Sequence, residues 1–268
     1  MPELPDVEIF RRVLERHGLN RIVTAVEVRD PRIVVGITPA AFARALGGDR
    51  LLATRRHGKN LFAARGRGGH LRMHFGMTGA LEPFREEPPA HARILYRFAQ
   101  GPHLAHVDVR RLGRVGLVKD IGAWLEAEGI GPDALDPALT AEWFAEALGG
   151  GRRSIKLVLM DQGLVAGIGN VYADEILFRA GLRPDVPVSA LDEGWRERLF
   201  AAMREVLQTA VDCGAAAERY VERLPDDFLT KRRGKGAHCP RCDTPLETLR
   251  IGGRRSYFCP RCQIDPRG

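Results

Sequence analysis

Four of the five cysteines stand near the C-terminus in two identical C-P-R-C pairs, at positions 239–242 and 259–262. Sixteen residues separate the pairs, which is long enough for a β-hairpin. Two close pairs of thiolates on two turns form a tetrahedral four-sulfur site for zinc. Because four thiolates leave no coordination position open for a substrate, we expect one structural zinc ion that stabilises the fold of the tail. The expected ligands are Cys239, Cys242, Cys259 and Cys262.

Between the cysteine pairs, the sequence GGRRSYF places two arginines directly after two glycines, at the tip of the expected hairpin. Residues 230–268 carry ten Lys or Arg and three Asp or Glu, an excess of seven that equals the net charge of the whole chain. A basic segment of this kind, in a chain with a pI near 9.5, favours nucleic acid as a partner. We therefore expect Arg254 and Arg255 to contact a nucleic-acid backbone.

The chain opens MPELPDVEIF, with two prolines and three acids in the first eight residues. Pro5, Asp6 and Glu8 are typical of a helix start, because proline suits the first turn and acids suit the positive end of the helix dipole. These signals of a helix start do not explain Pro2 and Glu3. A proline followed at once by a carboxylate at the front of the chain is therefore a candidate for chemistry.

The elements that would position these residues change in character along the chain. Residues 5–17 have apolar positions at helical spacing, and Gly18 follows as a stop. From about 21 to 119, short segments rich in β-branched and aromatic residues are divided by Gly and Pro, which predicts an all-β sandwich or barrel. One helical insertion, at 39–48, interrupts this pattern.

A linker with Pro132 and Pro137 precedes a second half that is mainly helical. Between two of its helices lies GLVAGIGN, at 163–170, which has three glycines in its first seven residues. A helix, a tight glycine turn and a second helix can bring backbone amides close to a phosphate. The predicted helices cover residues 140–148, 154–162, 171–180 and 193–213.

The 268-residue chain has no apolar run of the ~18 residues that a membrane span needs. Its acidic start differs from the basic and then apolar layout of a signal peptide. We therefore expect no membrane partner and a cytoplasmic location, associated with the nucleoid if the source is bacterial.

Four features now occur in order: MPELPDVE, a β-rich first half, a helical segment around AGIGNVYADE, and a four-cysteine hairpin with arginines at its tip. Together they resemble the formamidopyrimidine-DNA glycosylase and endonuclease VIII family of base-excision repair enzymes, over essentially the whole chain. MPELP is similar to the formamidopyrimidine branch, since endonuclease VIII proteins typically have glycine where this chain has Leu4. The resemblance implies an N-terminal β-sandwich with flanking helices (1–130), a helix-two-turn-helix domain (131–228) and a zinc β-hairpin (229–268).

In this family the initiator methionine is removed and the exposed proline nitrogen is the nucleophile, a role that the resemblance gives to Pro2. A terminal amine has a pKa near ~8, against ~10.4 for lysine, so more of it is free base at neutral pH. Glu3 matches the general acid and base of the family. Asp6 departs from the glutamate that is more usual in this branch.

The resemblance assigns two further residues to the reaction. Lys59, in HGKNL, resembles a β-hairpin lysine that contacts DNA close to the lesion and assists the elimination. Arg254 corresponds to the arginine that grips the phosphates beside the lesion and is linked to δ elimination.

A base that is extruded from the duplex leaves a void, which inserted side chains usually fill. Met77, Arg110 and Leu112 resemble the residues that the family inserts, although Leu112 stands where an aromatic is usual. A leucine still wedges by apolar contact but stacks less well on bases. The DNA-binding residues that the resemblance implies are therefore Met77, His91, Arg110, Leu112, Lys156 and Asn170.

The implied partner is double-stranded DNA with damaged bases or abasic sites, and the implied enzyme is a monomeric DNA glycosylase with AP lyase activity. The segment 216–238 should hold the loop that closes over an everted base, but Lys231, Arg232 and Arg233 replace the expected tyrosine-glycine-arginine signature. The preferred lesion stays open. The alternatives are an endonuclease VIII-like enzyme for oxidised pyrimidines, or a protein that binds damaged DNA without catalysis.

Overall fold

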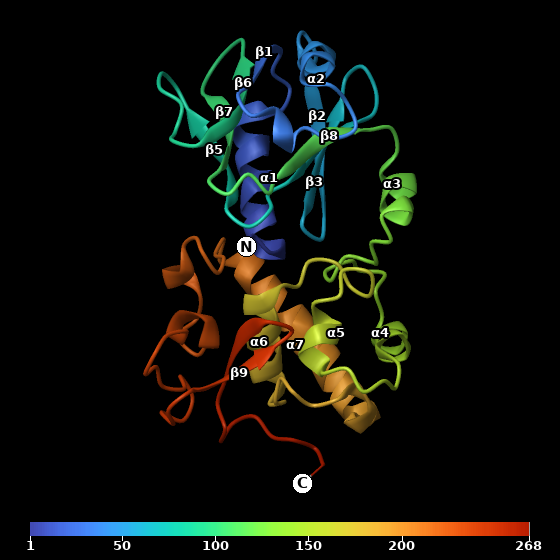
Figure 1. Ribbon diagram of the computed structural model, residues 1–268, viewed down its shortest axis with the longest axis vertical. Helices are drawn as coiled ribbons and strands as arrows, with labels where there is room; N and C mark the ends of the chain where they lie inside the picture. The colour runs from blue at the N-terminus through green and yellow to red at the C-terminus, as the bar shows by residue number, and fades with distance from the viewer. Residues whose placement is uncertain (268) are drawn as a thin grey trace. The chain divides into compact units, whose positions relative to one another are not determined.

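The computed structural model describes residues 1–267 and divides into two compact units, Met1–Gly129 and Ile130–Gly268 (Figure 1). Each unit has its own arrangement of helices and strands and is described by itself. The first unit is mainly β, and the second is mainly helical with a terminal β-hairpin.

The N-terminal unit contains two four-stranded antiparallel sheets, in the strand orders β1-β6-β7-β5 and β2-β3-β4-β8. Apolar side chains of both sheets meet in one core. This is the predicted β-sandwich, which the structure confirms. Its strands are β1 (Val23–Val28), β2 (Leu51–His57), β3 (Asn60–Arg65), β4 (His70–His74), β5 (Gly79–Phe84), β6 (Ala92–Phe98), β7 (His103–Asp108) and β8 (Arg114–Val118).

Helix α1 (Leu4–Gly18) contacts strands of both sheets and completes this core (Figure 1). Val7, Phe10 and Leu14 recur at helical spacing and are almost completely buried among the strands. The first helical turn is also buried. Because fully burying one such side chain contributes roughly 1.5–3 kcal/mol, the core holds the first residues of the chain firmly.

Three shorter helical segments complete the unit: η1 (Pro31–Ile33), α2 (Pro39–Leu46) and α3 (Ile121–Ala127). The sequence analysis predicted α2 but missed α3. The signal was present, because the side chain of Asp120 caps the helix by accepting the N–H of Ala123 at 2.8 Å. Trp124 then anchors α3, since its ring lies under the guanidinium of Arg72 at 4.3 Å.

The second unit is built around helices α6 and α7, which pack against each other, with α5 on α6 and α4 on α7. All four were predicted, and their bounds agree with the predicted ranges to within three residues. The helical segments are α4 (Ala141–Leu148), α5 (Ile155–Leu159), α6 (Asn170–Ala180), η2 (Val188–Ala190), α7 (Glu193–Asp212), η3 (Val221–Arg223) and η4 (Leu229–Arg232).

The chain ends in a hairpin of β9 (Glu247–Ile251) and β10 (Arg254–Phe258). Gly252 and Gly253 form its two-residue turn, with φ angles of +55° and +74°. Positive φ at both central positions is the geometry of a type I′ turn, which matches the twist of the strands and favours glycine. The predicted hairpin between the cysteine pairs is therefore confirmed. Over the described residues, no helix is both long and apolar enough to cross a membrane.

One buried histidine makes the N-terminal unit sensitive to acid. His106 on β7 is fully buried and stacks on Phe75, with ring centroids 5.1 Å apart. Burial lowers its pKa to about 4. Since the folded state binds a proton here less readily than the unfolded chain, His106 contributes stability that is complete above pH ~6.5 and is lost as pH falls toward 4.

We expect the free energy of unfolding to fall by up to about 3 kcal/mol more in the wild type than in His106→Phe between pH 7 and pH 4. Urea unfolding at a series of pH values measures this difference, and comparison with the variant cancels the contribution of other titrating groups. Parallel pH dependences of the two proteins would contradict the assignment.

Candidate active site and nucleic-acid interface

The N-terminal residues are held at the buried start of α1. Pro2 and Glu3 are buried, and Glu3 is the N-cap residue of the helix. The carboxylate of Asp6 accepts the backbone N–H of Glu3 at 2.9 Å. Asp6 is shorter than the glutamate usual at this position, yet it reaches the backbone and fixes Glu3. The positive end of the helix dipole also favours the Glu3 carboxylate.

Helix α1 runs antiparallel to β2, and this brings its first turn toward Lys59. The guanidinium of Arg11 donates to the hydroxyl of Thr54 at 3.4 Å. One turn nearer the N-terminus, Glu8 pairs with Arg56 at 3.5 Å. The helix therefore begins at the end of the sandwich where β2 turns into β3 (Figure 1). Lys59 therefore shares this end with Pro2 and Glu3, although it lies far from them in the sequence.

Lys59 occupies the two-residue turn between β2 and β3, after Gly58 at φ +55°. Its side chain is largely buried, with 8% exposed. Burial, and then the positive charges of Arg72 and Lys59, lower the pKa of His74 to about 4. His74 is thus neutral at pH 7, and its Nδ1 accepts the N–H of Gly76 at 3.2 Å. The sequence analysis missed His74, which interacts with Lys59 on one side and with the loop after β4 on the other.

The three residues predicted to fill the void lie on two neighbouring loops. Met77 stands between β4 and β5, and Arg110 and Leu112 stand between β7 and β8. Met77 and Leu112 are each 39% exposed, so both apolar side chains are accessible to a ligand. Arg110 Nη1 lies 3.1 Å from the sulfur of Met77. The structure therefore brings Met77 and Arg110 into contact and carries Leu112 on the same loop as Arg110, at the end of the sandwich that holds Lys59.

The carboxylate of Asp108 joins the two loops. It accepts the hydroxyl of Thr78 at 2.7 Å, the N–H of Gly113 at 2.7 Å and the N–H of Arg110 at 3.2 Å. Burial acts to raise the pKa of Asp108, but the hydrogen bonds from Thr78 and Gly113 hold it below its usual value. Asp108 is fully buried, so this carboxylate holds the two loops and is not itself exposed to a ligand.

His91 lies beside this cluster. It is exposed, it has a φ of +61°, and its carbonyl accepts the N–H of Asp108 at 3.1 Å. The imidazole is therefore attached to a constrained backbone, next to the loop that carries Arg110 and Leu112. This position is compatible with the expected contact to DNA, which stays a prediction.

The remaining predicted DNA contacts belong to the second unit. Asn170 begins α6 directly after the glycine turn, and its amide nitrogen donates to the carbonyl of Arg255 at 3.3 Å. Arg254 is exposed at the start of β10. Lys156 is fully buried and pairs with Asp174 at 2.7 Å. A contact of Lys156 with phosphate would require this ion pair to open.

The four predicted zinc ligands form one cluster, with all sulfurs within 4.8 Å of one another. Three of the Sγ–Sγ distances are 3.4, 3.5 and 3.8 Å. A tetrahedron with Zn–S bonds of about 2.3 Å needs sulfurs about 3.8 Å apart, so the cluster fits one zinc ion. Burial and the neighbouring sulfurs raise the pKa of Cys262, and a divalent cation reverses this effect by binding the thiolate.

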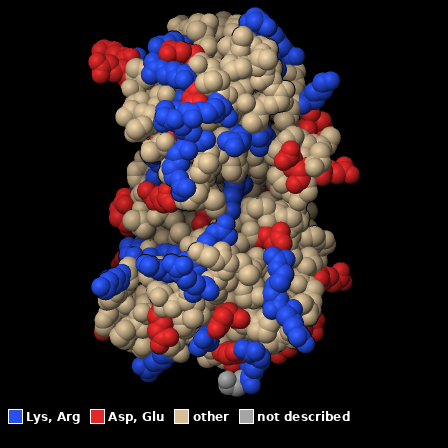
Figure 2. Space-filling view, viewed as in Figure 1, with Lys and Arg blue, Asp and Glu red and all other residues tan. Residues whose placement is uncertain are grey.

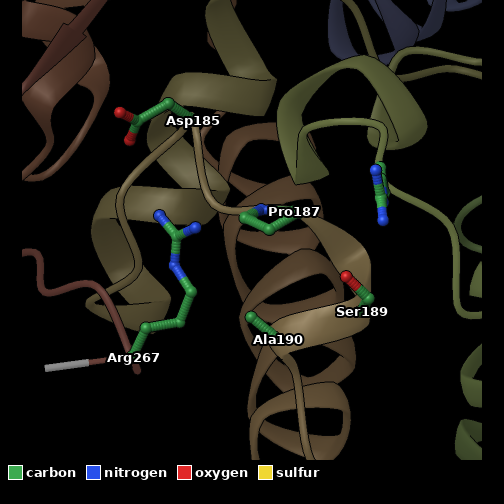
Figure 3. Close-up of a pocket in the computed structure, with 6 residues that line it drawn as sticks. Asp185, Pro187, Ser189, Ala190 and Arg267 are labelled. Carbon is green, nitrogen blue, oxygen red and sulfur yellow. The ribbon is translucent and has the colours of Figure 1, made fainter.

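Cationic side chains gather in patches on the face of both units that Figure 2 shows. A hollow in the second unit, shown in Figure 3, contains none of the predicted site residues. Its lining includes a carboxylate, Asp185, and one of its two arginines, Arg267, pairs with Asp265 at 2.5 Å, which makes it a poor site for an anion such as DNA. The lining residues are Arg152, Asp185, Pro187, Ser189, Ala190 and Arg267.

Family models match three successive parts of the chain: a formamidopyrimidine-DNA glycosylase N-terminal domain at 1–115, a formamidopyrimidine-DNA glycosylase H2TH domain at 130–221, and a zinc finger found in FPG and IleRS at 238–264. The formamidopyrimidine-DNA glycosylase of Pelobacter propionicus is 38% identical, over 98% of this chain and 100% of its own. The chain belongs to the formamidopyrimidine-DNA glycosylase family.

Other members of the formamidopyrimidine-DNA glycosylase family agree with this assignment. The Thermus thermophilus member is 38% identical, over 98% of each chain. The Lactococcus lactis enzyme, solved with DNA that contains an abasic site, superposes with a TM-score of 0.88 at 29% identity, over 98% of this chain and 100% of that one. The same enzyme with DNA that contains a benzylated formamidopyrimidine gives a TM-score of 0.89 at 28% identity, with the same coverage.

Loss of the Thr78 hydroxyl should slow the insertion of Met77, Arg110 and Leu112, the wedge residues, into DNA. Thr78→Val removes one hydrogen bond to Asp108, worth about 1 kcal/mol, so we expect base extrusion to slow about fivefold. Stopped-flow fluorescence of 2-aminopurine opposite the lesion measures this rate. Thr24→Val, which removes an exposed hydroxyl on β1, serves as the control. Equal rates for both variants would contradict the role of the Asp108 cluster.

Removal of zinc should unfold the terminal hairpin, because its few apolar residues cannot replace the metal. We expect Cys259→Ser to bind far less than one zinc ion per chain and to lose most of its affinity for DNA. Metal analysis and a DNA-binding titration measure both effects. Cys213→Ser, which changes the one cysteine outside the cluster, should match the wild type. Full zinc content in Cys259→Ser would contradict the four-sulfur site.

Proposed function

We propose that this chain excises oxidised or ring-opened purines from double-stranded DNA and then cleaves the abasic site by β,δ elimination. Family membership makes it a DNA glycosylase of base-excision repair. The observation that carries the mechanism is the burial of Pro2 and Glu3 at the start of α1, at the same end of the sandwich as Lys59. An amine nucleophile, an acid–base group and a cation thus share one site.

The proposed reaction starts after removal of Met1, which turns the Pro2 nitrogen from an amide into a secondary amine. That nitrogen attacks C1′ of the damaged nucleotide, and the bond from C1′ to the base breaks. Glu3 protonates the ring oxygen, so the sugar opens and an iminium forms between Pro2 and C1′. The positive charge of the iminium acidifies the protons on C2′.

Loss of a C2′ proton then expels the 3′ phosphate, and a second elimination expels the 5′ phosphate. Water finally hydrolyses the iminium and frees the amine. Lys59 and Arg254 would stabilise the departing phosphates, because cations at developing negative charge lower the barrier. The wedge residues Met77, Arg110 and Leu112 would occupy the space that the extruded base leaves.

The substrate class follows from the relatives, which are named formamidopyrimidine-DNA glycosylases and include an enzyme solved on abasic and formamidopyrimidine DNA. We propose a cytoplasmic location, associated with the nucleoid if the source is bacterial. Because the segment before the zinc hairpin lacks the expected signature, a preference for oxidised pyrimidines is the second candidate. Faster excision of thymine glycol than of 8-oxoguanine and formamidopyrimidine, on otherwise identical duplexes, would favour that candidate.

Borohydride trapping tests the mechanism directly. Reduction of the iminium joins enzyme and DNA covalently, so wild-type protein from which Met1 has been removed should crosslink to an abasic-site duplex. Pro2→Gly replaces this secondary amine with a primary amine and should crosslink more weakly. Digestion and mass spectrometry should find the adduct on residue 2.

A protein with an uncleavable extension before Pro2 supplies the control, because its residue 2 nitrogen stays an amide. It should bind the duplex but form no crosslink. A crosslink of wild-type strength from the extended protein would refute the role of Pro2. Tight binding of the processed protein to damaged DNA without any turnover would support the noncatalytic alternative.

A further inference from the structure

A single buried carboxylate connects helix α6 to the zinc hairpin. Asp174 is 1% exposed and is surrounded by four donors from three segments of the second unit. Its Oδ1 forms an ion pair with the ammonium of Lys156 at 2.7 Å and accepts the hydroxyl of Ser256 at 2.5 Å. Its Oδ2 accepts from the backbone N–H of Tyr257 at 3.0 Å and from the guanidinium of Arg233.

The charges around Asp174 make this arrangement stable. Two cations, Lys156 and Arg233, neutralise the buried carboxylate, and the hydroxyl and the N–H complete its hydrogen bonds. A buried charge is tolerated only when it is paired and hydrogen-bonded in this way. Arg233 also stacks on the ring of Tyr257 at 4.7 Å, which adds a second contact to β10.

Strand β10 has a neighbouring strand on one edge only, and α6 satisfies the other edge. Arg255 and Tyr257 are two residues apart, so their peptide groups point to the same edge of the strand. Asn170 donates to the carbonyl of Arg255, and Asp174 accepts from the N–H of Tyr257. Asn170 and Asp174 are four residues apart and therefore lie on one face of α6.

The same contacts determine where Arg254 points. Side chains alternate along a strand, so Arg254 and Ser256 project from one face of β10, about 7 Å apart. Ser256 is fully buried against Asp174, whereas Arg254 is exposed one step nearer the turn. Arg255 projects from the opposite face. The Asp174–Ser256 hydrogen bond therefore holds the face of the strand from which Arg254 projects.

The turn itself is docked on α5. A Cβ on Gly252 would come within 2.5 Å of Leu157, so the glycine allows the turn to lie directly on that helix. Arg254 Nη1 lies 4.0 Å from the sulfur of Met160. The arginine is thus carried on a hairpin that is held at its turn, along its edge and at its zinc site.

We propose that Asp174 is a positioning residue that orients Arg254 toward the DNA phosphates, through Ser256 and the edge of β10. Zinc folds the hairpin, and Asp174 sets its direction relative to α6. Lys156 contributes by neutralising Asp174. The proposal rests on the proposed function for the role of Arg254, and it predicts that Asp174 and Arg254 act as one unit.

A double-mutant cycle on the full-length, zinc-loaded protein tests this coupling. We expect Asp174→Asn and Arg254→Ala each to weaken binding to a duplex with a tetrahydrofuran abasic analogue by about tenfold and to slow δ elimination more than β elimination. In the Arg254→Ala background, Asp174→Asn should change affinity by less than about twofold. In the Arg255→Ala background, it should keep its full effect.

Two readouts separate positioning from general loss of structure. Asp174→Asn should retain its zinc and should form the borohydride crosslink at Pro2 to within about twofold of the wild type, because other residues make the iminium. Asp227→Asn is the matched control, since Asp227 also pairs with an arginine of this unit, at 2.9 Å, but that arginine is Arg179 on α6 and not a residue of the hairpin. It should behave as the wild type.

Ser256→Ala keeps the test decisive if Asp174→Asn does not fold, because it removes one uncharged donor. We expect a loss of affinity of about threefold that also disappears in the Arg254→Ala background. Unchanged affinity in Ser256→Ala, multiplicative effects of Asp174→Asn and Arg254→Ala, or loss of zinc in Asp174→Asn would each overturn the proposal. Affinity for the uncleavable analogue needs no chemistry, so this test stands even if the crosslink at Pro2 fails to form.

Discussion

The burial of the first turn of α1 is the constraint on which the N-terminal site depends. A chain terminus usually frays, because few contacts hold it. Here Leu4, Val7 and Phe10 pack into the core of the sandwich, and Asp6 closes the first turn on the N–H of Glu3. Once Met1 is removed, an amine at Pro2, which directly precedes this helix start, would be fixed in place before DNA binds. This ordering suits a nucleophile whose geometry controls its reactivity.

Two buried aspartates organise the surfaces that would meet DNA. Asp108 holds the loops of Met77, Arg110 and Leu112 in the first unit, and Asp174 holds the zinc hairpin in the second. In both units, a buried carboxylate accepts hydrogen bonds from segments that are distant in sequence. An exposed arginine, Arg110 or Arg254, lies nearby at the surface. Breaking a buried ion pair such as that of Asp174 with Lys156 typically costs about 3–5 kcal/mol, so such a group can hold a hairpin firmly.

The departures from the usual pattern of the family have local explanations. Asp6 is shorter than a glutamate, but it still reaches the N–H of Glu3 at 2.9 Å. Leu112 is exposed on its loop and keeps the apolar character of a wedge. In the basic run before the zinc hairpin, Lys231 pairs with Asp226 and Arg233 with Asp174. At least two of these cations therefore serve the protein itself.

The sequence determined the elements and the metal site, because both depend on local spacing. Alternating apolar segments predicted the sandwich, helical periodicity predicted α1 and α4–α7, and two C-P-R-C pairs predicted the zinc cluster. Only the tertiary structure decided which residues meet. The antiparallel packing of α1 on β2 brings Pro2 and Lys59 to one end of the sandwich, and the docking of β10 on α6 buries Lys156 against Asp174. Such contacts join residues distant in sequence, so no local pattern could reveal them.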